Sequence, residues 1–158
     1  MALDLLAAVL EEERFGAACR VAATELATQL GCSRVSLGFL RRGQSEVESI
    51  SHSAQFGKRM NLVRLLAEAM DEALDQHAVV LFPPLAEDDV VLTRAHAVLA
   101  AAHDAAQILT VPIFVKDRFI GAVTFERDAA EPFDQASIDL AEAGGVDSWP
   151  RARRQARQ

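Results

Sequence analysis

Two histidines in one predicted helix are the first residues of this sequence that could bind a metal ion. His96 and His103 lie seven residues apart in "TRAHAVLAAAHDAA". That spacing puts both on one face of a helix, but about 10 Å apart along its axis. Two helical ligands of one zinc ion are normally four residues apart. We therefore predict no metal site and interpret both residues as ordinary surface or pocket-edge histidines.

Four carboxylates form a second pattern, at positions i, i+3, i+4 and i+7 of another predicted helix. They are Glu68, Asp71, Glu72 and Asp75. Such a stripe could hold a divalent cation or contact a basic partner. We interpret it as the solvated face of an amphipathic helix, since Arg64 stands four residues before Glu68 and can pair with it. One helix face does not provide the opposed pair of acids that acid–base catalysis uses, so no catalytic residue is predicted.

The two cysteines, Cys19 and Cys32, could do redox chemistry only as separate thiols. If the helix between them runs nearly to Gly31, their backbones lie about 20 Å apart, too far for a disulfide. No CxxC or Cys/His spacing indicates a zinc site. Cys32 follows Gly31 at a helix-to-strand junction and could be partly exposed, which a reactive thiol requires. The alternative is that Cys32 packs as a small buried hydrophobic side chain.

Charge and hydropathy exclude several classes of partner. The 158-residue chain has a net charge of -7, although its last eight residues, "RARRQARQ", carry four arginines and no acid. The remainder is therefore strongly acidic and repels phosphate backbones, so we expect no nucleic-acid partner for it. No apolar run is long enough to cross a bilayer, and the first residues lack the features of a signal peptide. We expect a soluble cytoplasmic chain.

The elements that position these residues follow from hydrophobic periodicity. The first third predicts a helix ending at Gly31, with Phe15–Gly16 as a place where it could break. The segments "RVSLGFLR" and "VESISHS" alternate as two strands of a hairpin. A helix from Asn61 to about His77 comes next, then a short strand at Val79–Phe82 and a helix from about Thr93. Two strands in "ILTVPIFVKDRFIGAVTFER" and a last helix, capped by Asp134, complete the order.

This order predicts an α+β fold with a central, mainly antiparallel sheet of about five strands and helices on both sides. We expect residues 1–143 to form a single domain, with residues 1–12 as an N-terminal helical extension. Residues 144–158 form a tail that is rich in arginine and interrupted by glycine and proline, and we predict that it is disordered.

The segment Ile108–Arg127 has apolar side chains on both faces of its two strands, as a sheet covered on both sides requires. We expect Leu109 and the residues alternating with it on one face, and Phe114 on the other. Thr110 and Thr124 are the polar exceptions. If they point into one cavity they can hydrogen-bond a ligand, and otherwise they are ordinary strand threonines. Gly121 indicates a close approach by a neighbouring element.

Three segments resemble the GAF domain, a sensory module that binds small molecules. They are "LGCSRVSLGFL", "ILTVPIFVKDRFIGAVTFER" and "PFDQASIDLAEA", and the resemblance spans about Phe15 to Ala143. It implies a noncatalytic regulatory module with a pocket between the sheet and the segment Ser53–His103, for a ligand and cofactor that it does not identify. Within that pocket one histidine could hydrogen-bond a ligand or bind haem. The candidate ligand contacts are Phe56, Arg59, His96, Thr110 and Thr124.

A narrower resemblance is to the GAF segment that precedes the membrane anchor in some bacterial membrane-fusion, or periplasmic adaptor, proteins of secretion and efflux systems. It is carried by "LGCSRVSLGFL", "SHSAQF" and "AMDEALDQ". Two alternatives to a working sensor remain open. The chain could be a degenerate GAF module used only for homodimerisation through its terminal helices, since Leu3, Leu6 and Leu10 extend the first helix. It could also be a redox enzyme using Cys32, although free methionine sulfoxide reductases on this fold depend on several cysteines.

Overall fold

The computed structural model describes residues 2–51, 60–84, 91–128 and 132–139. The elements follow the predicted order, and the last helix is described over residues 135–139. Their bounds are α1 (Ala2–Leu30), β1 (Arg34–Arg41), β2 (Gln44–Ile50), α2 (Met60–Gln76), β3 (Val80–Phe82), α3 (Arg94–His103), β4 (Gln107–Val115) and β5 (Arg118–Arg127).

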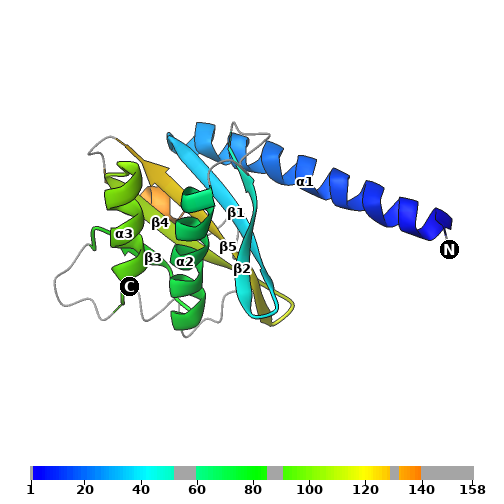
Figure 1. The fold of residues 1–158 in the computed structure, drawn as a ribbon. Coiled ribbons are helices and arrows are strands. Elements are labelled where there is room, and N and C mark those ends of the chain that lie inside the picture. The colour runs from blue at the N-terminus through cyan, green and yellow to red at the C-terminus, as the bar shows by residue number, and fades with distance from the viewer. Residues whose placement is uncertain (1, 52–59, 85–90, 129–131, 140–158) are drawn as a thin grey trace.

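The strands form one five-stranded sheet in the order β2-β1-β5-β4-β3. Each neighbouring pair is antiparallel. Helices α2 and α3 cover one face, while α1 and residues 135–139 lie on the other (Figure 1). The predicted α+β architecture is confirmed. Strands β4 and β5 come from the Ile108–Arg127 segment. Two of the candidate ligand contacts, Thr110 and Thr124, therefore lie in the middle of the sheet.

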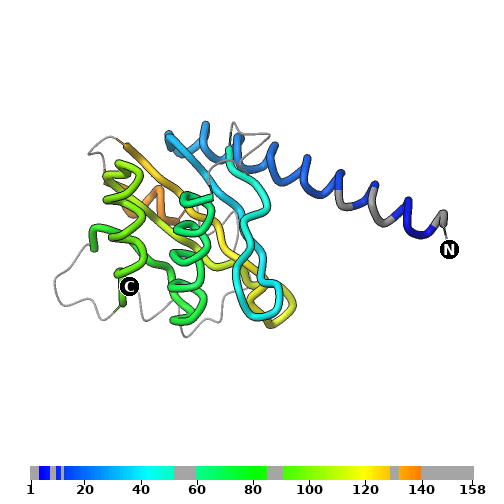
Figure 2. The backbone as a smooth tube through the Cα atoms, in the orientation of Figure 1, coloured from blue at the N-terminus to red at the C-terminus, as the bar shows by residue number. Residues whose placement is uncertain are grey.

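Helix α1 is a single helix that runs through Phe15 and Gly16 without the break we considered. It ends at Gly31, whose φ of 61° is the left-handed conformation that glycine adopts readily. Only its second half packs on the sheet, through Cys19, Ala23, Ala27 and Leu30. The first half extends away from the domain as an arm (Figure 2).

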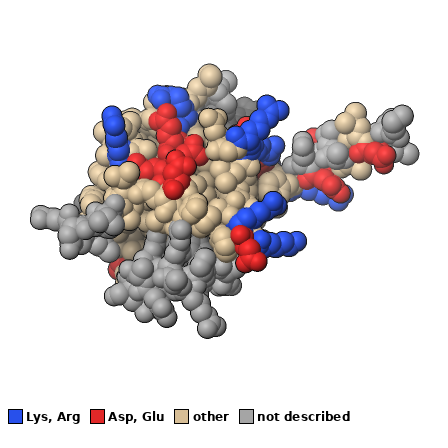
Figure 3. Space-filling model, turned by 90° about the horizontal axis from the view of Figure 1, so that it is seen from below, with Lys and Arg blue, Asp and Glu red and all other residues tan. Residues whose placement is uncertain are grey.

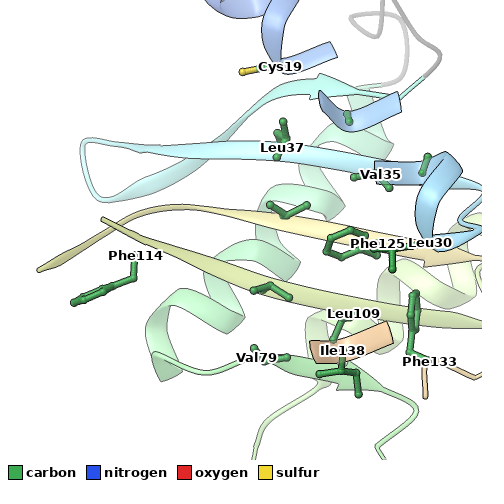
Figure 4. Packing of buried hydrophobic residues seen from close by; sticks show 14 residues of the cluster. Cys19, Leu30, Val35, Leu37, Val79, Leu109, Phe114, Phe125, Phe133 and Ile138 are labelled. Atoms are coloured by element: carbon green, nitrogen blue, oxygen red, sulfur yellow. The ribbon is translucent and has the colours of Figure 1, made fainter. Parts of the chain in front are cut away.

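Two apolar cores lie on opposite faces of the sheet. The α1 face buries Val35, Leu109, Phe125 and Phe133 among others, and Figure 4 shows these side chains gathered between the strands and the short helical turn. The opposite face buries leucines of α2 and α3 against β2 and β4, among them Leu62, Leu66 and Leu99 with Ile50 and Ile108. Each core holds its helices onto the sheet by removing apolar surface from water.

Two local features refine the strand expectations. The β4–β5 register shifts between Ile113 and Phe114, where the pairing skips Ile120 of β5. Beside this irregularity Phe114 is buried in the same apolar cluster as Leu109, so our assignment of Phe114 to the opposite face was wrong. The predicted close approach at Gly121 is confirmed, because a Cβ atom there would lie 2.1 Å from the carbonyl oxygen of Gly38 on β1. The β4–β5 hairpin turns at Lys116 and Asp117, the charged residues at its tip.

Candidate functional site

His96 is fully buried on the first turn of α3, between α2 and the sheet. Its ring nitrogen Nδ1 lies 2.7 Å from Oε1 of Glu72 on α2. The other ring nitrogen, Nε2, lies 2.7 Å from Oγ1 of Thr110 on β4. One imidazole therefore connects two helices and a central strand, which corrects our interpretation of His96 as a surface or pocket-edge residue.

The hydrogen-bonded chain continues across the sheet to Thr124. Thr110 and Thr124 are paired in the β4–β5 register, so their side chains emerge from the same face. Their hydroxyl oxygens lie 3.0 Å apart, and neither side chain is exposed. Glu72, His96, Thr110 and Thr124 thus form a continuous chain of hydrogen bonds, which we call the polar chain.

The Glu72 end of the polar chain also caps α3. Thr93 occupies the N-cap position but makes no side-chain capping bond. Instead, the amide of Ala95 donates to Glu72 Oε2 at 2.8 Å, and the amide of His96 donates to Oε1 at 3.2 Å. A carboxylate supplied by α2 therefore satisfies two of the unpaired amides at the start of α3 and faces the positive end of its dipole.

These bonds favour the charged form of Glu72. Burial alone would raise its pKa, but the bonds from the His96 ring and from the amides of Ala95 and His96 outweigh burial and lower the pKa below its ordinary value. At neutral pH, Glu72 is an ionised acceptor that serves three donors. The Glu72 side chain is only 11% exposed, so solvent weakens these bonds little.

Gln76, one turn further along α2, holds the residues that lead into α3. Its amide nitrogen donates to the carbonyl oxygen of Leu92 at 2.9 Å, and its amide oxygen accepts from the Leu92 amide at 2.6 Å. Glu72 and Gln76 together bind the backbone from Leu92 to His96. The start of α3 is therefore held by side chains of α2 in addition to its own packing.

The Thr124 end of the polar chain adjoins a hydroxyl that has no partner. Ser36 on β1 pairs with Thr124 in the β1–β5 register, so their side chains lie on the same face about 5 Å apart at Cβ. Ser36 is fully buried, and its Oγ has no hydrogen bond among the described residues. A buried hydroxyl without a partner is costly, so a polar group bound at this point would be stabilised.

Three of the five candidate contacts therefore come together: His96, Thr110 and Thr124 are consecutive members of one chain. Phe56 and Arg59 lie outside the described residues. Sequence reasoning missed Glu72 and Ser36. The signal for Ser36 was its polar side chain in an alternating predicted strand, but nothing in the sequence pairs it with Thr124.

The interpretation of the acidic stripe as a solvated face fails for half of it. Glu72 caps α3, and Asp71 Oδ1 accepts a hydrogen bond from the amide of Ser45 on β2 at 2.8 Å. Glu68 pairs with Arg64 as expected, at 3.3 Å on the exposed side. A single-helix pattern shows which residues share a face, but α2 is covered by other elements along part of that face.

The order of hydroxyl, imidazole and carboxylate in Thr110, His96 and Glu72 is that of an acyl-transfer triad. A nucleophile must reach its substrate, but Thr110 and His96 are completely buried. The Thr110 hydroxyl is also already bonded on both sides, to His96 and Thr124. The arrangement can orient protons and hold elements together, and it offers no accessible nucleophile in this conformation.

Both cysteines are free, as predicted. Burial raises the pKa of Cys32 to about 11, although the nearby Arg127 lowers it in part. Burial and the charge of Glu48 also raise the pKa of Cys19. Both groups are therefore thiols at neutral pH, and a reactive thiolate is disfavoured at either position.

The described residues contain no group of three or more histidine, cysteine or acidic side chains placed to hold a metal ion. Within the same residues, no helix combines the length and apolarity that crossing a membrane requires.

Comparison with known proteins agrees with the sheet topology. The profile of the GAF domain family matches residues 15–145, and no curated protein matches the chain. Among solved structures, the GAF domain of a two-component sensor histidine kinase from Bacillus halodurans is 15% identical, with a TM-score of 0.52 over 84% of this chain and 91% of that one.

Two further structures show how varied the proteins with this fold are. A type II free methionine-R-sulfoxide reductase from Thermoplasma acidophilum is 14% identical, with a TM-score of 0.61 over 84% of this chain and 87% of that one. The phycoerythrobilin-bound GAF domain of a cyanobacterial phytochrome is 12% identical, with a TM-score of 0.55 over 86% and 83%. At these identities the likeness concerns the fold, whereas the profile match covers most of the chain. This protein belongs to the GAF domain family.

Proposed function

We propose that this GAF domain is a noncatalytic regulatory module that binds a small molecule on the α2–α3 side of the sheet, at the Thr124 end of the polar chain. The observation that carries the proposal is the fully buried hydroxyl of Ser36 beside Thr124, which has no hydrogen-bond partner among the described residues. Because both side chains are buried, the elements that cover this face of the sheet must move to admit the ligand. A ligand group bonded there would be connected through Thr110, His96 and Glu72 to the start of α3. Binding could then alter how α3 is held.

The noncatalytic part of the proposal rests on the state of the candidate nucleophiles. The triad-like hydroxyl of Thr110 is already hydrogen-bonded on both sides, to His96 and Thr124, and burial keeps the thiol of Cys32 protonated at neutral pH. Because one structural neighbour is a free methionine sulfoxide reductase, the protein should be tested for turnover of methionine sulfoxide. Methionine sulfoxide turnover by the wild-type protein that is lost in Cys32→Ser would refute this part.

A melting screen against a metabolite library tests ligand binding. We expect at least one compound to raise the Tm of the wild-type protein and to have a smaller effect on Thr124→Val, which removes one hydroxyl while keeping the shape. The matched control is Thr28→Val on the exposed side of α1, where the Thr28 hydroxyl donates to the carbonyl oxygen of Thr24. A screen in which no small molecule stabilises the protein would contradict a working sensor.

A second function, homodimerisation, is favoured by the exposed apolar side chains of α1. Leu6, Leu10 and Val21 are 54%, 43% and 67% exposed and lie on a face other than the one that packs on the sheet. The arm that carries the first two stands clear of the domain, with acidic and basic side chains along it (Figure 3). Apolar residues spaced along a helix in this way are typical of a helix that packs against another helix.

We propose that the partner of this arm is a second copy of the chain in the cytoplasm. Deletion of residues 1–12 should convert a dimer to a monomer in light scattering, and Leu10→Lys should weaken the dimer. Val98→Lys, which changes an exposed apolar residue of α3, is the control. An unchanged mass after the deletion would contradict this function. The narrower similarity to membrane-fusion proteins remains a prediction that a neighbouring gene for a transport system would support.

A further inference from the structure

The hydrogen bonds of the polar chain are donated in one direction, from Thr124 toward Glu72. Glu72 fixes the first step. Its two oxygens accept from the amides of Ala95 and His96, and those bonds favour the ionised carboxylate. An ionised carboxylate only accepts hydrogen bonds, so the Nδ1 atom of His96, 2.7 Å away, must carry a hydrogen.

With a neutral ring, the remaining steps follow. A neutral imidazole protonated at Nδ1 has a lone pair at Nε2, so the Thr110 hydroxyl donates to it. The Thr110 oxygen then accepts from the hydroxyl of Thr124. Each of the hydrogens in this direction has an acceptor.

The opposite direction leaves a buried hydrogen unsatisfied. If both nitrogens of His96 carried hydrogens, Nε2 would donate to Thr110, and Thr110 would donate to Thr124. The Thr124 hydroxyl would then have to donate away from the chain, yet the neighbouring Ser36 Oγ makes no hydrogen bond. A buried donor without an acceptor costs free energy, so the direction toward Glu72 is favoured.

We propose that Glu72, acting through His96, is a positioning residue that sets the direction of the polar chain and thereby makes Thr124 a hydrogen-bond acceptor for the ligand. This inference rests on the proposed ligand site. The ligand group would donate to Thr124 and could accept from Ser36, as a hydroxyl or a primary amide does. An ionised carboxylate offers no hydrogen to Thr124.

The charges beside this point agree with a neutral ligand group. Two residues further along the same strands, Arg34 and Glu126 are paired in register and form a bidentate salt bridge. Because this arginine already has a carboxylate partner, it offers no free positive charge to an anionic ligand. Glu72, the charged end of the polar chain, would also repel an anion.

Nitrogen NMR of the His96 ring tests the direction of the chain without any ligand. At pH 7 we expect a protonated Nδ1 and an unprotonated Nε2, with the signals assigned through His96→Gln. In Glu72→Gln the neutral amide can also donate to Nδ1, so the Nε2–H tautomer should appear. Glu68→Gln, the same change one turn earlier on the exposed side of α2, should leave the ring unchanged.

Two results would overturn the positioning role: a wild-type ring protonated at Nε2, or an unchanged tautomer in Glu72→Gln. If Glu72→Gln fails to fold, the wild-type ring still decides the direction.

Acetamide and acetate test the ligand chemistry, since they share a shape but only acetamide donates. We expect acetamide to shift the NMR signals of Ser36 and Thr124 and acetate to leave them unchanged. Thr124→Val should weaken the acetamide response by up to about tenfold, the factor that one hydrogen bond supplies, whereas Thr28→Val should not. A response to acetate would overturn the proposed direction. No response to either probe would overturn the ligand site itself, and the ring nitrogens would still report the direction separately.

Discussion

Among single residues, Glu72 forms contacts from α2 to α3 that no sequence pattern indicated. One carboxylate accepts from the ring of His96 and from two backbone amides of α3. Removing an acceptor from buried or partly buried donors costs more than the bond itself contributes, because the donors remain without partners. The stability of the domain should therefore depend on this residue more than on other acids of α2.

The first prediction concerns the size of that effect. Glu72→Gln should lower the free energy of unfolding by about 1.5–3 kcal/mol, the range for hydrogen bonds to a charged group. Glu68→Gln on the exposed side should change it by about 0.5 kcal/mol or less. Urea denaturation followed by circular dichroism measures both variants. Equal effects at the two positions would show that the contacts to α3 contribute nothing measurable.

The second prediction is the pH dependence of the Glu72 contribution. Its pKa in the folded protein is lower than the ordinary value of 4.5. The carboxylate therefore stabilises the fold fully above the unfolded-state pKa, and this contribution is lost as the pH falls through the lower folded-state pKa. The difference between wild type and Glu72→Gln should be constant near neutral pH and shrink in acid below pH 4.5. A difference that grows in acid would contradict the assignment.

The third prediction concerns Cys32, whose pKa burial raises to about 11. At pH 8 roughly one thiol in a thousand is ionised, and only the thiolate attacks a disulfide reagent. A thiolate of higher pKa is also more nucleophilic, so Cys32 in the native protein should react about ten times more slowly than free cysteine, and faster as the pH rises toward 11. The same protein in urea is the control and should react rapidly. A fast native phase at pH 7 that disappears in Cys32→Ser would contradict the inert thiol.

At the scale of elements, the sheet depends on close contact between β1 and β5. Gly121 pairs with Phe39 across the two strands, and a Cβ at Gly121 would lie 2.1 Å from the Gly38 carbonyl oxygen and 3.0 Å from the Phe39 Cα. Both obstacles are backbone atoms, which cannot rotate away as a side chain can. Any larger residue must therefore separate two central strands.

Gly121→Ala should accordingly lower the free energy of unfolding by about 3 kcal/mol or more, at the upper end of overpacking effects. The control is Gly16→Ala, where the nearest atoms to a new Cβ belong to flexible side chains, Glu48 at 3.4 Å and Arg20 at 4.0 Å. Because Gly16 lies inside α1, alanine there should stabilise the protein by about 0.5–1 kcal/mol. Chemical denaturation compares the two, and effects of the same sign would contradict the argument.

The strands and helices were predictable because their periodicity is local. The alternation around Thr110 and Thr124 placed both residues on one face of the sheet, and the closing helix was expected from its cap at Asp134, which accepts a bond from the Ser137 amide at 2.7 Å. The partners of a side chain are not local. The sequence placed Glu72 in an acidic stripe, but only the packing of α3 against α2 shows that it caps another helix.

The irregularity in the β4–β5 pairing was not predictable. The extra residue, Ile120 of β5, is apolar like its neighbours, so the sequence does not show that Phe114 is buried in the same cluster as Leu109. Likewise, His96 was expected at a pocket edge. Its burial depends on having a partner at both ring nitrogens, which no spacing in the sequence reveals.

At the scale of the whole molecule, Arg127 connects the two ends of the domain. Its guanidinium donates to the carbonyl oxygen of Leu30 at the end of α1 and, at 3.0 Å, to that of Pro132 before the last helical turn. It also lies 4.2 Å from the centre of the Phe133 ring. One side chain at the end of β5 thus holds both terminal helices on the same face of the sheet.

Replacing Arg127 should therefore loosen the C-terminal segment before it unfolds the sheet. Arg127→Met keeps an unbranched chain beside Phe133 but removes both hydrogen bonds and the cation–π contact, so residues 132–139 lose most of their polar contact with α1 and β5. We expect faster hydrogen exchange at the Ile138 amide, which bonds to the Asp134 carbonyl at 3.0 Å, with little change in the β4–β5 amides. Arg118→Met, at the exposed start of β5, is the control and should leave Ile138 unchanged. Uniform acceleration across the sheet would show instead that Arg127 supports the whole fold, and unchanged exchange at Ile138 would show that apolar packing of Phe133 and Ile138 suffices to hold this end.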